Sequence, residues 1–325
     1  MRSASVMSLD GPAAVKVATS PEPPADPDLV QVEVHMAGVS FPDVLLTRGL
    51  YQVKPEPPFV LGAEFAGVVR SAPVSADLRP GDRVAGVVVH GAFAGVVAAR
   101  PQFVVPLPDD LSFETASAMP MNYLTAHFML TRRARLRDGE TLLVHGGAGG
   151  IGTATVQVGR TLGATVIAVV SNPAKRDVAL QAGAHHVVGS QTFRDEVAEL
   201  TSGRGVDIVV DPVGGDRFTD SLRCLSPEGR LLVVGFTAGE IPSVKVNRLL
   251  LNNIDVRGVA WGPYAMAKPG YIREQWRDLT PMLRFGDVHP VISDVYDLQD
   301  VGQALTEIED RHVLGKVLLR IGEHS

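Results

Sequence analysis

The chain has 325 residues, 45% of them hydrophobic, which is enough for two domains with sizeable cores at the usual ~150 residues each. Its 36 acidic and 30 basic side chains leave a formal charge of −6, the wrong sign for a protein whose main partner is nucleic acid. The single cysteine, Cys224, excludes an internal disulfide and a cysteine-rich zinc site, and we expect it to be a core residue.

No segment predicts a membrane span or a secretory signal. The longest nearly apolar run, from Val84 to Ala99, is interrupted by His90 and by glycines, and it is shorter than the ~20 residues of a membrane helix. It is more typical of two strands that turn at His90-Gly91. The N-terminus carries no apolar leader, so a cytoplasmic location is expected.

The first hundred residues are expected to be mostly β structure. Val-rich runs punctuated by Gly and Pro predict strands at Leu29 to Val34, Val60 to Val69 and Arg83 to Val89. From Leu111 the pattern becomes helical, with Ser112 as a cap for a short helix to Ala118, a break at Pro120, and a second helix from Tyr123 to Leu130. This change predicts a domain boundary near residue 120.

The middle of the chain alternates strands and helices. Such alternation predicts a parallel, doubly wound sheet. The expected strands are Thr141 to Val144, Thr165 to Val170, Asp207 to Val210, Arg230 to Val234 and Ile254 to Val259. The expected helices are Ile151 to Leu162, Ala174 to Ala182, Phe218 to Leu225 and, after the last of these strands, Ile272 to Phe285. The tail adds a helix from Val301 to Ile308 and a strand from Val317 to Ile321 that could return to the N-terminal domain.

A glycine-rich turn follows the predicted strand that ends at Val144. Gly147, Gly149 and Gly152 fit the pattern GxGxxG between a strand and a helix. Glycines there permit a tight turn and let a pyrophosphate approach the amides at the helix N-terminus, because no Cβ intrudes. The sequence therefore predicts a dinucleotide site that includes Gly147, Ala148, Gly149, Gly150, Ile151 and Gly152.

The end of the next strand indicates which dinucleotide binds. An NAD site usually has Asp or Glu there for the ribose 2′-hydroxyl, whereas this chain has Ser171 and Asn172. Asn172 can cap the following helix with Pro173 at its first position, which places Lys175 in the first turn. Ser171, Lys175 and Arg176 are therefore predicted to hold a 2′-phosphate, so NADPH is favoured; the alternative is that both cations are ordinary solvated charges.

Several motifs in a fixed order resemble the medium-chain dehydrogenase/reductase superfamily, in particular its zinc-independent quinone oxidoreductase branch. They are Gly38-Val-Ser-Phe-Pro-Asp-Val44, Gly49-Leu-Tyr51, Pro58-Phe-Val-Leu-Gly-Ala-Glu-Phe-Ala-Gly67, Gly81-Asp-Arg-Val84, Asn122-Tyr-Leu-Thr-Ala126, the glycine-rich turn, Asp211-Pro-Val-Gly-Gly215 and Gly315-Lys-Val317. The resemblance implies a GroES-like β domain (residues 1–120 and 292–325) joined to a Rossmann domain (121–291). It also implies an active site in the cleft between them and a homodimer.

The zinc-dependent alcohol dehydrogenases of that superfamily carry Cys and His ligands where this chain has Ser40 and Ala63. Glu64 remains, but a catalytic zinc normally needs three protein ligands. His185 and His186 are adjacent, point in different directions, and are expected to be surface residues. No metal is predicted.

The resemblance also implies which residues lie in the active-site cleft. Ser40 and Asp43 follow the strand that ends near Val39 and are candidates to contact the nicotinamide ribose or the substrate, although the family often has Asn where Ser40 stands. Tyr51 is a candidate hydrogen-bond donor to a substrate carbonyl, with packing of its ring as the alternative. These three are the predicted catalytic residues.

Further residues are predicted to bind the cofactor. Asn122 and Thr125 lie at the domain junction, where Asn122 is alternatively a helix cap. Others follow later strands at their carboxyl ends, where open α/β sheets place ligands: Val213, Gly235, Phe236 and Trp261. Trp261 is equally expected to be a core residue. Lys316 is a candidate cofactor contact, with a surface lysine as its alternative.

Without a Lewis acid, the chemistry expected is hydride transfer to an acceptor that is already electron-poor. The sequence therefore predicts an NADPH-dependent reductase of quinones or similar conjugated carbonyls. An enoyl or alkenal reductase uses the same hydride chemistry and is the second hypothesis. A third, from another class, is a non-catalytic NADPH-binding protein.

Overall fold

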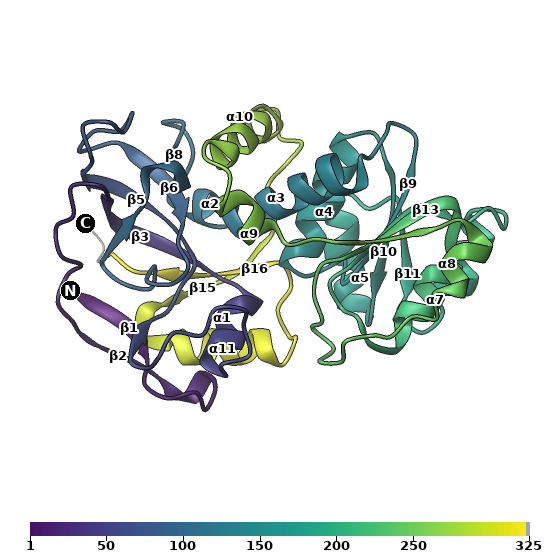
Figure 1. Cartoon of the computed structure of the whole chain (residues 1–325), viewed down its shortest axis with the longest axis horizontal. Helices are drawn as coiled ribbons and strands as arrows, with labels where there is room; N and C mark the ends of the chain where they lie inside the picture. Colours follow the sequence, from purple (N-terminus) through teal and green to yellow (C-terminus); the bar gives the residue numbers. More distant parts are fainter. Residues whose placement is uncertain (323–325) are drawn as a thin grey trace. The chain divides into compact units, whose positions relative to one another are not determined.

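The computed structural model describes residues 1–322 and divides the chain into two compact units (Figure 1). The first unit comprises Met1–Met121, Lys268–Arg277 and Ile292–Ser325, and the second comprises Asn122–Ala267 and Asp278–Val291. Compared with the expected domains, the first unit also takes Lys268–Arg277. One reason lies in that segment, where the indole Nε1 of Trp276 donates a hydrogen bond to the carbonyl of Pro106, 3.1 Å away.

The first unit contains two sheets. The larger has the order β15-β16-β3-β5-β6-β8, with β7 also paired to β3, and the smaller has the order β2-β1-β4. The larger sheet is built from β3 (Val30–Val39), β5 (Glu64–Ser71), β6 (Arg83–Val87), β7 (Val96–Ala99), β8 (Val104–Pro106), β15 (Ile292–Asp297) and β16 (Lys316–Arg320). The smaller is built from β1 (Arg2–Val6), β2 (Val15–Thr19) and β4 (Phe59–Val60).

The prediction that the last strand returns to the N-terminal domain is confirmed. Strand β16 pairs antiparallel with β3, and Val317 lies opposite Val39. This pairing brings Lys316, the first residue of β16, beside the end of β3, where the candidate residue Ser40 begins the next helix.

Short helices complete the first unit. They are α1 (Phe41–Thr47), α2 (Phe113–Ser117) and α11 (Val301–Glu309), with 3-10 turns η1 (Pro12–Ala14), η2 (Pro101–Phe103) and η5 (Leu298–Asp300). Helix α10 (Tyr271–Arg284) runs from the first unit into the second. The predicted cap of α2 is confirmed, because the Ser112 hydroxyl accepts a hydrogen bond from the Thr115 amide.

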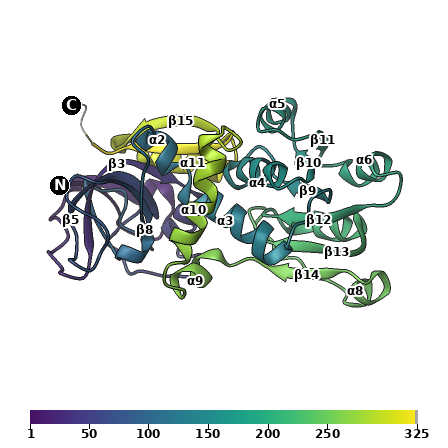
Figure 2. The same cartoon turned by 90° about the horizontal axis from the view of Figure 1, so that it is seen from above.

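The second unit is a six-stranded sheet with the order β11-β10-β9-β12-β13-β14, in which every neighbouring pair is parallel (Figure 2). The strands are β9 (Thr141–His145), β10 (Thr165–Val170), β11 (His186–Gly189), β12 (Val206–Asp211), β13 (Leu225–Val233) and β14 (Asp255–Gly258). This order confirms the predicted doubly wound sheet, and it places a topological switch point between β9 and β12.

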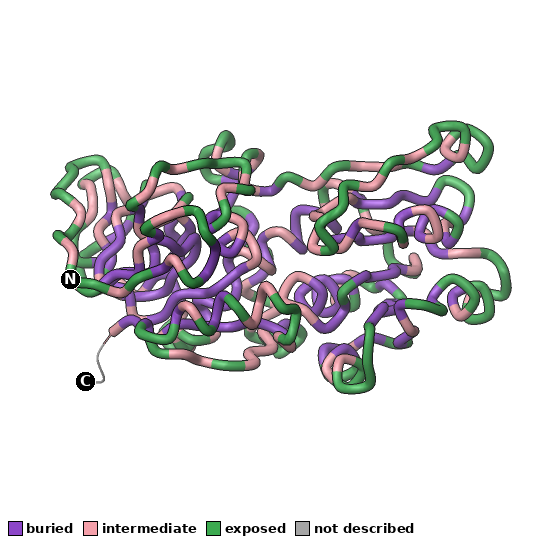
Figure 3. Tube along the Cα trace, turned by 90° about the horizontal axis from the view of Figure 1, so that it is seen from below, coloured by how far each residue is buried: buried purple, intermediate pink, exposed green. Residues whose placement is uncertain are grey.

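The helices of the second unit connect these strands. Helix α3 (Pro120–His127) starts in the first unit and continues into the π-helix η3 (Phe128–Ala134). The others are α4 (Gly150–Thr161), α5 (Pro173–Gln181), α6 (Phe193–Leu200), the 3-10 turn η4 (Gly215–Arg217), α7 (Phe218–Arg223), α8 (Asn247–Asn252) and α9 (Trp261–Met266). Strands β9, β10 and β12 are mostly buried, as is most of helix α4, whereas α5 and α8 are mostly exposed (Figure 3).

Some predicted elements differ from the structure. The run from Val60 to Val69 forms two strands in different sheets, since β4 pairs with β1 and β5 pairs with β3. The strands on either side of His90-Gly91 are not a hairpin, because β6 pairs with β5 and β8, whereas β7 pairs with β3. Pro120 starts a helix instead of breaking one, as its fixed φ suits the first helical position.

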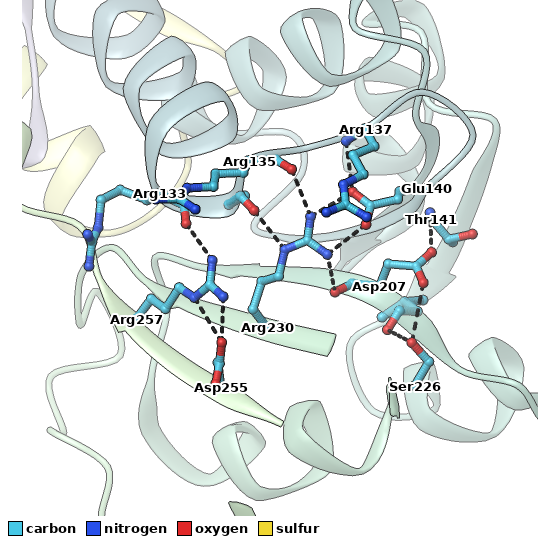
Figure 4. A network of polar contacts seen from close by, with 12 residues as sticks. Arg133, Arg135, Arg137, Glu140, Thr141, Asp207, Ser226, Arg230, Asp255 and Arg257 are labelled. Carbon is cyan, nitrogen blue, oxygen red and sulfur yellow. Dashed lines mark hydrogen bonds and ion pairs between the residues drawn. The ribbon is translucent and has the colours of Figure 1, made fainter. Parts of the chain in front are cut away.

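The buried Arg230, in the middle of β13, links this strand to the segment before β9. The guanidinium of Arg230 donates to both carboxylate oxygens of Glu140, at 2.8 and 2.6 Å, and to the carbonyl of Ala134 at 2.8 Å (Figure 4). Arg257 on β14 donates in the same region to the carbonyl of Arg133. These contacts fix the amino-terminal edge of the sheet, opposite the edge where the predicted cofactor residues lie.

None of the helices among residues 1–322 has the length and apolar character needed to cross a bilayer.

Candidate functional site

The glycine-rich turn joins β9 to α4 in the manner that a pyrophosphate site requires. A Cβ on Gly152 would lie 2.0 Å from the carbonyl oxygen of Gly146, and one on Gly147 would lie 2.7 Å from the Cβ of Ala168. These glycines therefore permit the close approach of the turn to the helix and to the neighbouring strand. Gly146 itself has φ +62°, in the region that favours glycine.

The space above Gly149 is open. A Cβ added to Gly149 would have the Gly146 carbonyl oxygen as its nearest neighbour, at 3.5 Å, which is an ordinary contact distance. Gly149 is the N-cap of α4, and no side chain accepts a hydrogen bond from the first turn of this helix. The first-turn amides, which lie at Gly150, Ile151 and Gly152, have no intrahelical acceptor and form the positive end of the helix dipole. An anionic pyrophosphate fits this position, and the neighbouring Ala148 is buried.

The end of β10 presents the residues predicted to select the dinucleotide. Ser171 is exposed, and the side chain of Asn172 accepts a hydrogen bond of 3.0 Å from the Lys175 amide. This confirms Asn172 as the cap, with Pro173 at the first position and Lys175 in the first turn of α5. The Arg176 guanidinium instead donates to the carbonyl of Val187 on β11, at 2.7 Å. Ser171 thus lies at the end of β10 and Lys175 in the first turn of α5, while Arg176 contacts β11.

The loop after β12 lies close to the same turn. The carboxylate of Asp211, 2% exposed, accepts hydrogen bonds of 2.9 Å from the amides of Val213 and Gly214. A Cβ on Gly146 would contact Val213 at 3.6 Å, so the two loops adjoin. Both stand at the carboxyl edge of the parallel sheet, as the sequence predicted for Val213.

Two more predicted cofactor positions follow β13 at that edge. Gly235 and Phe236 are half-buried, and their loop folds back so that the Thr237 amide donates to the carbonyl of Pro212. Trp261 is the first residue of α9 and is only 4% exposed, so core packing is its observed environment.

Asn122 and Thr125 lie on one face of α3, three residues apart, and both are partly exposed. Since α3 begins at Pro120, Asn122 is its third residue, and the alternative interpretation of Asn122 as a cap is wrong. Tyr123, between them, donates instead to the buried Gln157 on α4 at 2.8 Å, which fixes the helix in the second unit.

The first unit contains a buried polar cluster formed by Ser40, Asp43, Glu64 and Lys316, with exposed fractions of 8%, 0%, 0% and 3%. Lys316 donates to the Ser40 hydroxyl at 2.6 Å and also to the Glu64 carboxylate. The Ser40 hydroxyl in turn donates to Glu64 at 2.9 Å. Glu64 also accepts a hydrogen bond of 2.8 Å from the Met121 amide in the first turn of α3.

This cluster corrects the interpretation of Lys316 as a surface lysine. Its ammonium is held inside the first unit, so the predicted contact with a cofactor has no support from its position. The sequence analysis missed the ion pair because Glu64 and Lys316 are 252 residues apart and meet only through the pairing of β16 with β3 and of β3 with β5. The same contacts engage both functions of the Ser40 hydroxyl, since its proton goes to Glu64 and its oxygen accepts from Lys316.

Asp43 lies at the third position of α1, and one of its oxygens, Oδ2, accepts a 2.8 Å hydrogen bond from the Ser40 amide. The other oxygen, Oδ1, is buried without a hydrogen-bond partner. Burial is the largest cause that raises the pKa of Asp43 from 3.8 to about 7, while the Ser40 amide and the charge of Lys316 lower it.

Tyr51 follows α1 and is half-buried against the core of the first unit. Burial raises the pKa of its phenol, and the neighbouring charge of Asp43 raises it further. A phenol in this position keeps its proton through the neutral range. The three predicted catalytic residues are therefore gathered in the first unit, together with Glu64 and Lys316.

The first-unit residues do not fit a zinc ion. No group of three or more His, Cys, Asp or Glu side chains that could hold a metal occurs among residues 1–322. Glu64 is already bonded to the Lys316 ammonium, whose positive charge opposes a divalent cation.

Comparison with known proteins identifies the family. The alcohol dehydrogenase GroES-like domain family matches residues 26–109, and the family described as zinc-binding dehydrogenase matches residues 150–283. The quinone oxidoreductase-like protein 2 of Rattus norvegicus is 37% identical over 302 residues, which cover 92% of this chain and 86% of that protein.

Solved structures share the whole fold. A probable oxidoreductase of Mycobacterium abscessus has a TM-score of 0.91 at 43% identity, covering 98% of both chains. The quinone oxidoreductase of Escherichia coli complexed with NADPH has a TM-score of 0.91 at 28% identity, covering 98% of this chain and 100% of that one. Fold and site thus define an oxidoreductase with a dinucleotide-binding sheet. The chain belongs to the medium-chain dehydrogenase/reductase superfamily and, within it, to the zinc-independent quinone oxidoreductase-like family.

Proposed function

We propose that this protein is an NADPH-dependent reductase that transfers hydride to a quinone or a similar conjugated carbonyl acceptor. NADPH supplies the hydride when bound. The amides at the start of α4 bind the pyrophosphate, and Ser171 and Lys175 bind the 2′-phosphate. Tyr51 donates a hydrogen bond to the oxygen on which negative charge develops.

The proposal rests on the residues found at the end of β10. There the chain has an exposed serine, a capping asparagine and a first-turn lysine in place of an acid that would bind an unphosphorylated ribose. Similarity to the quinone oxidoreductase of Escherichia coli, whose solved structure holds NADPH, supports the same cofactor and acceptor class.

The test is oxidation of NADPH monitored with ortho- and para-quinones, enones and enoyl-thioesters, each against a reaction without acceptor. Turnover with quinones supports the proposal. Turnover confined to C=C reduction supports an enoyl or alkenal reductase instead. Tight NADPH binding with no oxidation by any acceptor supports a non-catalytic NADPH-binding protein, and either of these last two results contradicts the quinone assignment.

We also propose that the protein is a homodimer through the surface at α8 and β14. Strand β14 is the last of the parallel sheet and has one unpaired edge. In α8 and the segment before it, four apolar side chains are 71–76% exposed, namely Ile241, Val246, Leu250 and Leu251. A second copy would cover both features at once.

A further inference from the structure

A run of arginines lies just before β9, at the amino-terminal edge of the parallel sheet. Four of the six residues in this run are arginine, namely Arg132, Arg133, Arg135 and Arg137, and we call the run the arginine segment. The first two belong to the π-helix η3, and the last two belong to the loop that leads into β9. Because the whole chain has a formal charge of −6, this density of positive charge is a local feature and does not follow from overall composition.

The guanidinium groups of the arginine segment are not neutralised by the rest of the molecule. Arg135 and Arg137 are exposed, and neither side chain forms a hydrogen bond or an ion pair with any of residues 1–322. Arg132 lies over the ring of Tyr264, 4.8 Å from its centroid. Arg133 donates to a neutral acceptor, the carbonyl of Gly258, at 2.8 Å. Neither of these contacts removes a positive charge, so the segment keeps all of its cations.

The acidic residues near the segment are mostly engaged elsewhere. The carboxylate of Glu140 pairs with the buried Arg230 at 2.6 Å, and that of Asp255 pairs with Arg257 at 2.5 Å. Asp138 follows the segment directly and is exposed, but its single carboxylate cannot balance four guanidinium groups. The arginine segment therefore has an excess of positive charge that an external anion can neutralise.

The backbone of the segment is held in place by side chains from the sheet and from the start of β9 (Figure 4). Arg257 donates to the carbonyl of Arg133 at 2.9 Å, and the buried Arg230 donates to the carbonyl of Arg135 at 3.3 Å. The amide of Arg137 donates, at 2.9 Å, to the carboxylate that binds Arg230. Arg135 also has φ +54°, a left-handed conformation that is unusual for a residue with a side chain. A backbone fixed in this way presents its arginines with less entropy left to lose when an anion binds.

The chemistry of the segment favours the carboxylates of a protein partner. All of its cations are arginines, whose planar guanidinium groups bind carboxylates and phosphates through paired N–H donors. A long polyanion such as nucleic acid is a poor match, because the chain is acidic overall and Asp138 and Asp255 lie beside the segment. A short acidic stretch of a protein needs only the segment itself.

We propose that the arginine segment is a docking surface for an acidic stretch of a partner protein. The segment precedes β9, whereas the glycine-rich turn follows β9 at the opposite edge of the same sheet. A partner docked on the segment therefore leaves the dinucleotide site of this unit open. The proposal does not depend on which acceptor the enzyme reduces.

Fluorescence anisotropy with a fluorescein-labelled hexaglutamate peptide at low ionic strength tests this docking surface. The native protein should bind the peptide, and the double variant Arg135→Glu/Arg137→Glu should bind it about 10-fold more weakly, because two attractive charges become repulsive. The double variant Arg79→Glu/Arg100→Glu makes the same change in net charge at exposed arginines of the first unit and should bind like the native protein. No binding by the native protein, or equal losses in the two double variants, would overturn the proposal.

Phosphate-bearing ligands and a second copy of the chain are the alternative occupants of the segment. Inorganic phosphate or a single-stranded DNA oligonucleotide should displace the labelled peptide less well than unlabelled hexaglutamate does, and stronger displacement by either would contradict the proposal. Light scattering should give the native mass for Arg135→Glu/Arg137→Glu, whereas a lower mass would assign the segment to contacts between copies. Arg137→Gln removes one charge without reversing it and should weaken peptide binding by a smaller factor; native affinity in this variant would also count against the segment.

Discussion

At the scale of single residues, Lys316 is expected to stabilise the first unit through its buried ion pair with Glu64. Replacing Lys316 with Met leaves Glu64 as a buried and unpaired charge, so the free energy of unfolding should fall by about 3–5 kcal/mol. Urea denaturation measures the change. Lys54→Met removes an exposed lysine of the same unit and should shift stability by less than about 0.5 kcal/mol. Equal effects of the two substitutions would mean that the ion pair contributes nothing.

Asp43 should make the fold less stable as the pH rises. Its pKa is about 7 in the folded chain against the ordinary 3.8, so between these values the folded state binds the extra proton and unfolding releases it. The contribution falls by about 1.4 kcal/mol per pH unit over that window and is constant above it. Asp43→Asn should therefore gain stability relative to the native chain from about pH 5 to about pH 7.

Parallel urea titrations at several pH values check this expectation. A constant difference between Asp43→Asn and the native chain would show that Asp43 titrates normally in the folded protein. Since all other groups are shared, their own pH dependence cancels in the comparison.

Lys175 should determine the choice of dinucleotide. Replacing Lys175 with Glu places a negative charge beside the 2′-phosphate, so the KM for NADPH should rise far more than the KM for NADH. Lys16→Glu makes the same charge change at an exposed position of the first unit and serves as the control. Equal changes in both KM values for Lys175→Glu would refute the assignment of Lys175.

At the scale of elements, the turn between β9 and α4 offers a matched pair of glycines. Gly152→Ala would place a Cβ 2.0 Å from a backbone oxygen and should destabilise the second unit, whereas Gly149→Ala meets nothing closer than 3.5 Å and should unfold like the native chain. The Gly149 variant should nevertheless bind NADPH more weakly, because its methyl group takes space that the pyrophosphate needs.

Thermal unfolding and calorimetric titration with NADPH separate the two effects. Native NADPH affinity in a stably folded Gly149→Ala would place the pyrophosphate elsewhere.

Much of the second unit could be predicted from the sequence, since its signals are local. The glycine pattern is flanked by an apolar strand and an apolar-faced helix, and Asn172-Pro173 marks the start of α5. Strand β11 escaped prediction because it has only four residues and opens with an exposed histidine, so no period of hydrophobic residues develops. Helix α6, eight residues long, was missed with it.

The first unit was harder to predict because its site depends on contacts distant in sequence. Ser40 and Asp43 were identified from a resemblance, but the burial of Lys316 and its pairing with Glu64 follow from strand pairing that no local pattern encodes. The partners of β6 and β7 were misjudged for the same reason: an apolar run with a central turn does not specify which strands its two halves join.

At the scale of the whole molecule, the proposed dimer predicts a mass near twice the 34.5 kDa of the chain by light scattering after gel filtration. Replacing both Leu250 and Leu251 with Asp should give the mass of one chain, because charges at that surface oppose burial. Phe285→Asp alters another strongly exposed apolar residue and should leave the mass unchanged. A native chain that elutes as a monomer at micromolar concentration would exclude the dimer.

The proposed function of the whole molecule is hydride transfer from NADPH to a quinone. The most direct measurement is the initial rate of anaerobic NADPH oxidation by a para-quinone, with NADH at the same concentration as the comparison. We predict steady turnover with NADPH and a much lower kcat/KM with NADH. Oxidation of NADH at an equal or higher kcat/KM, or no quinone-dependent oxidation of either, would contradict the account.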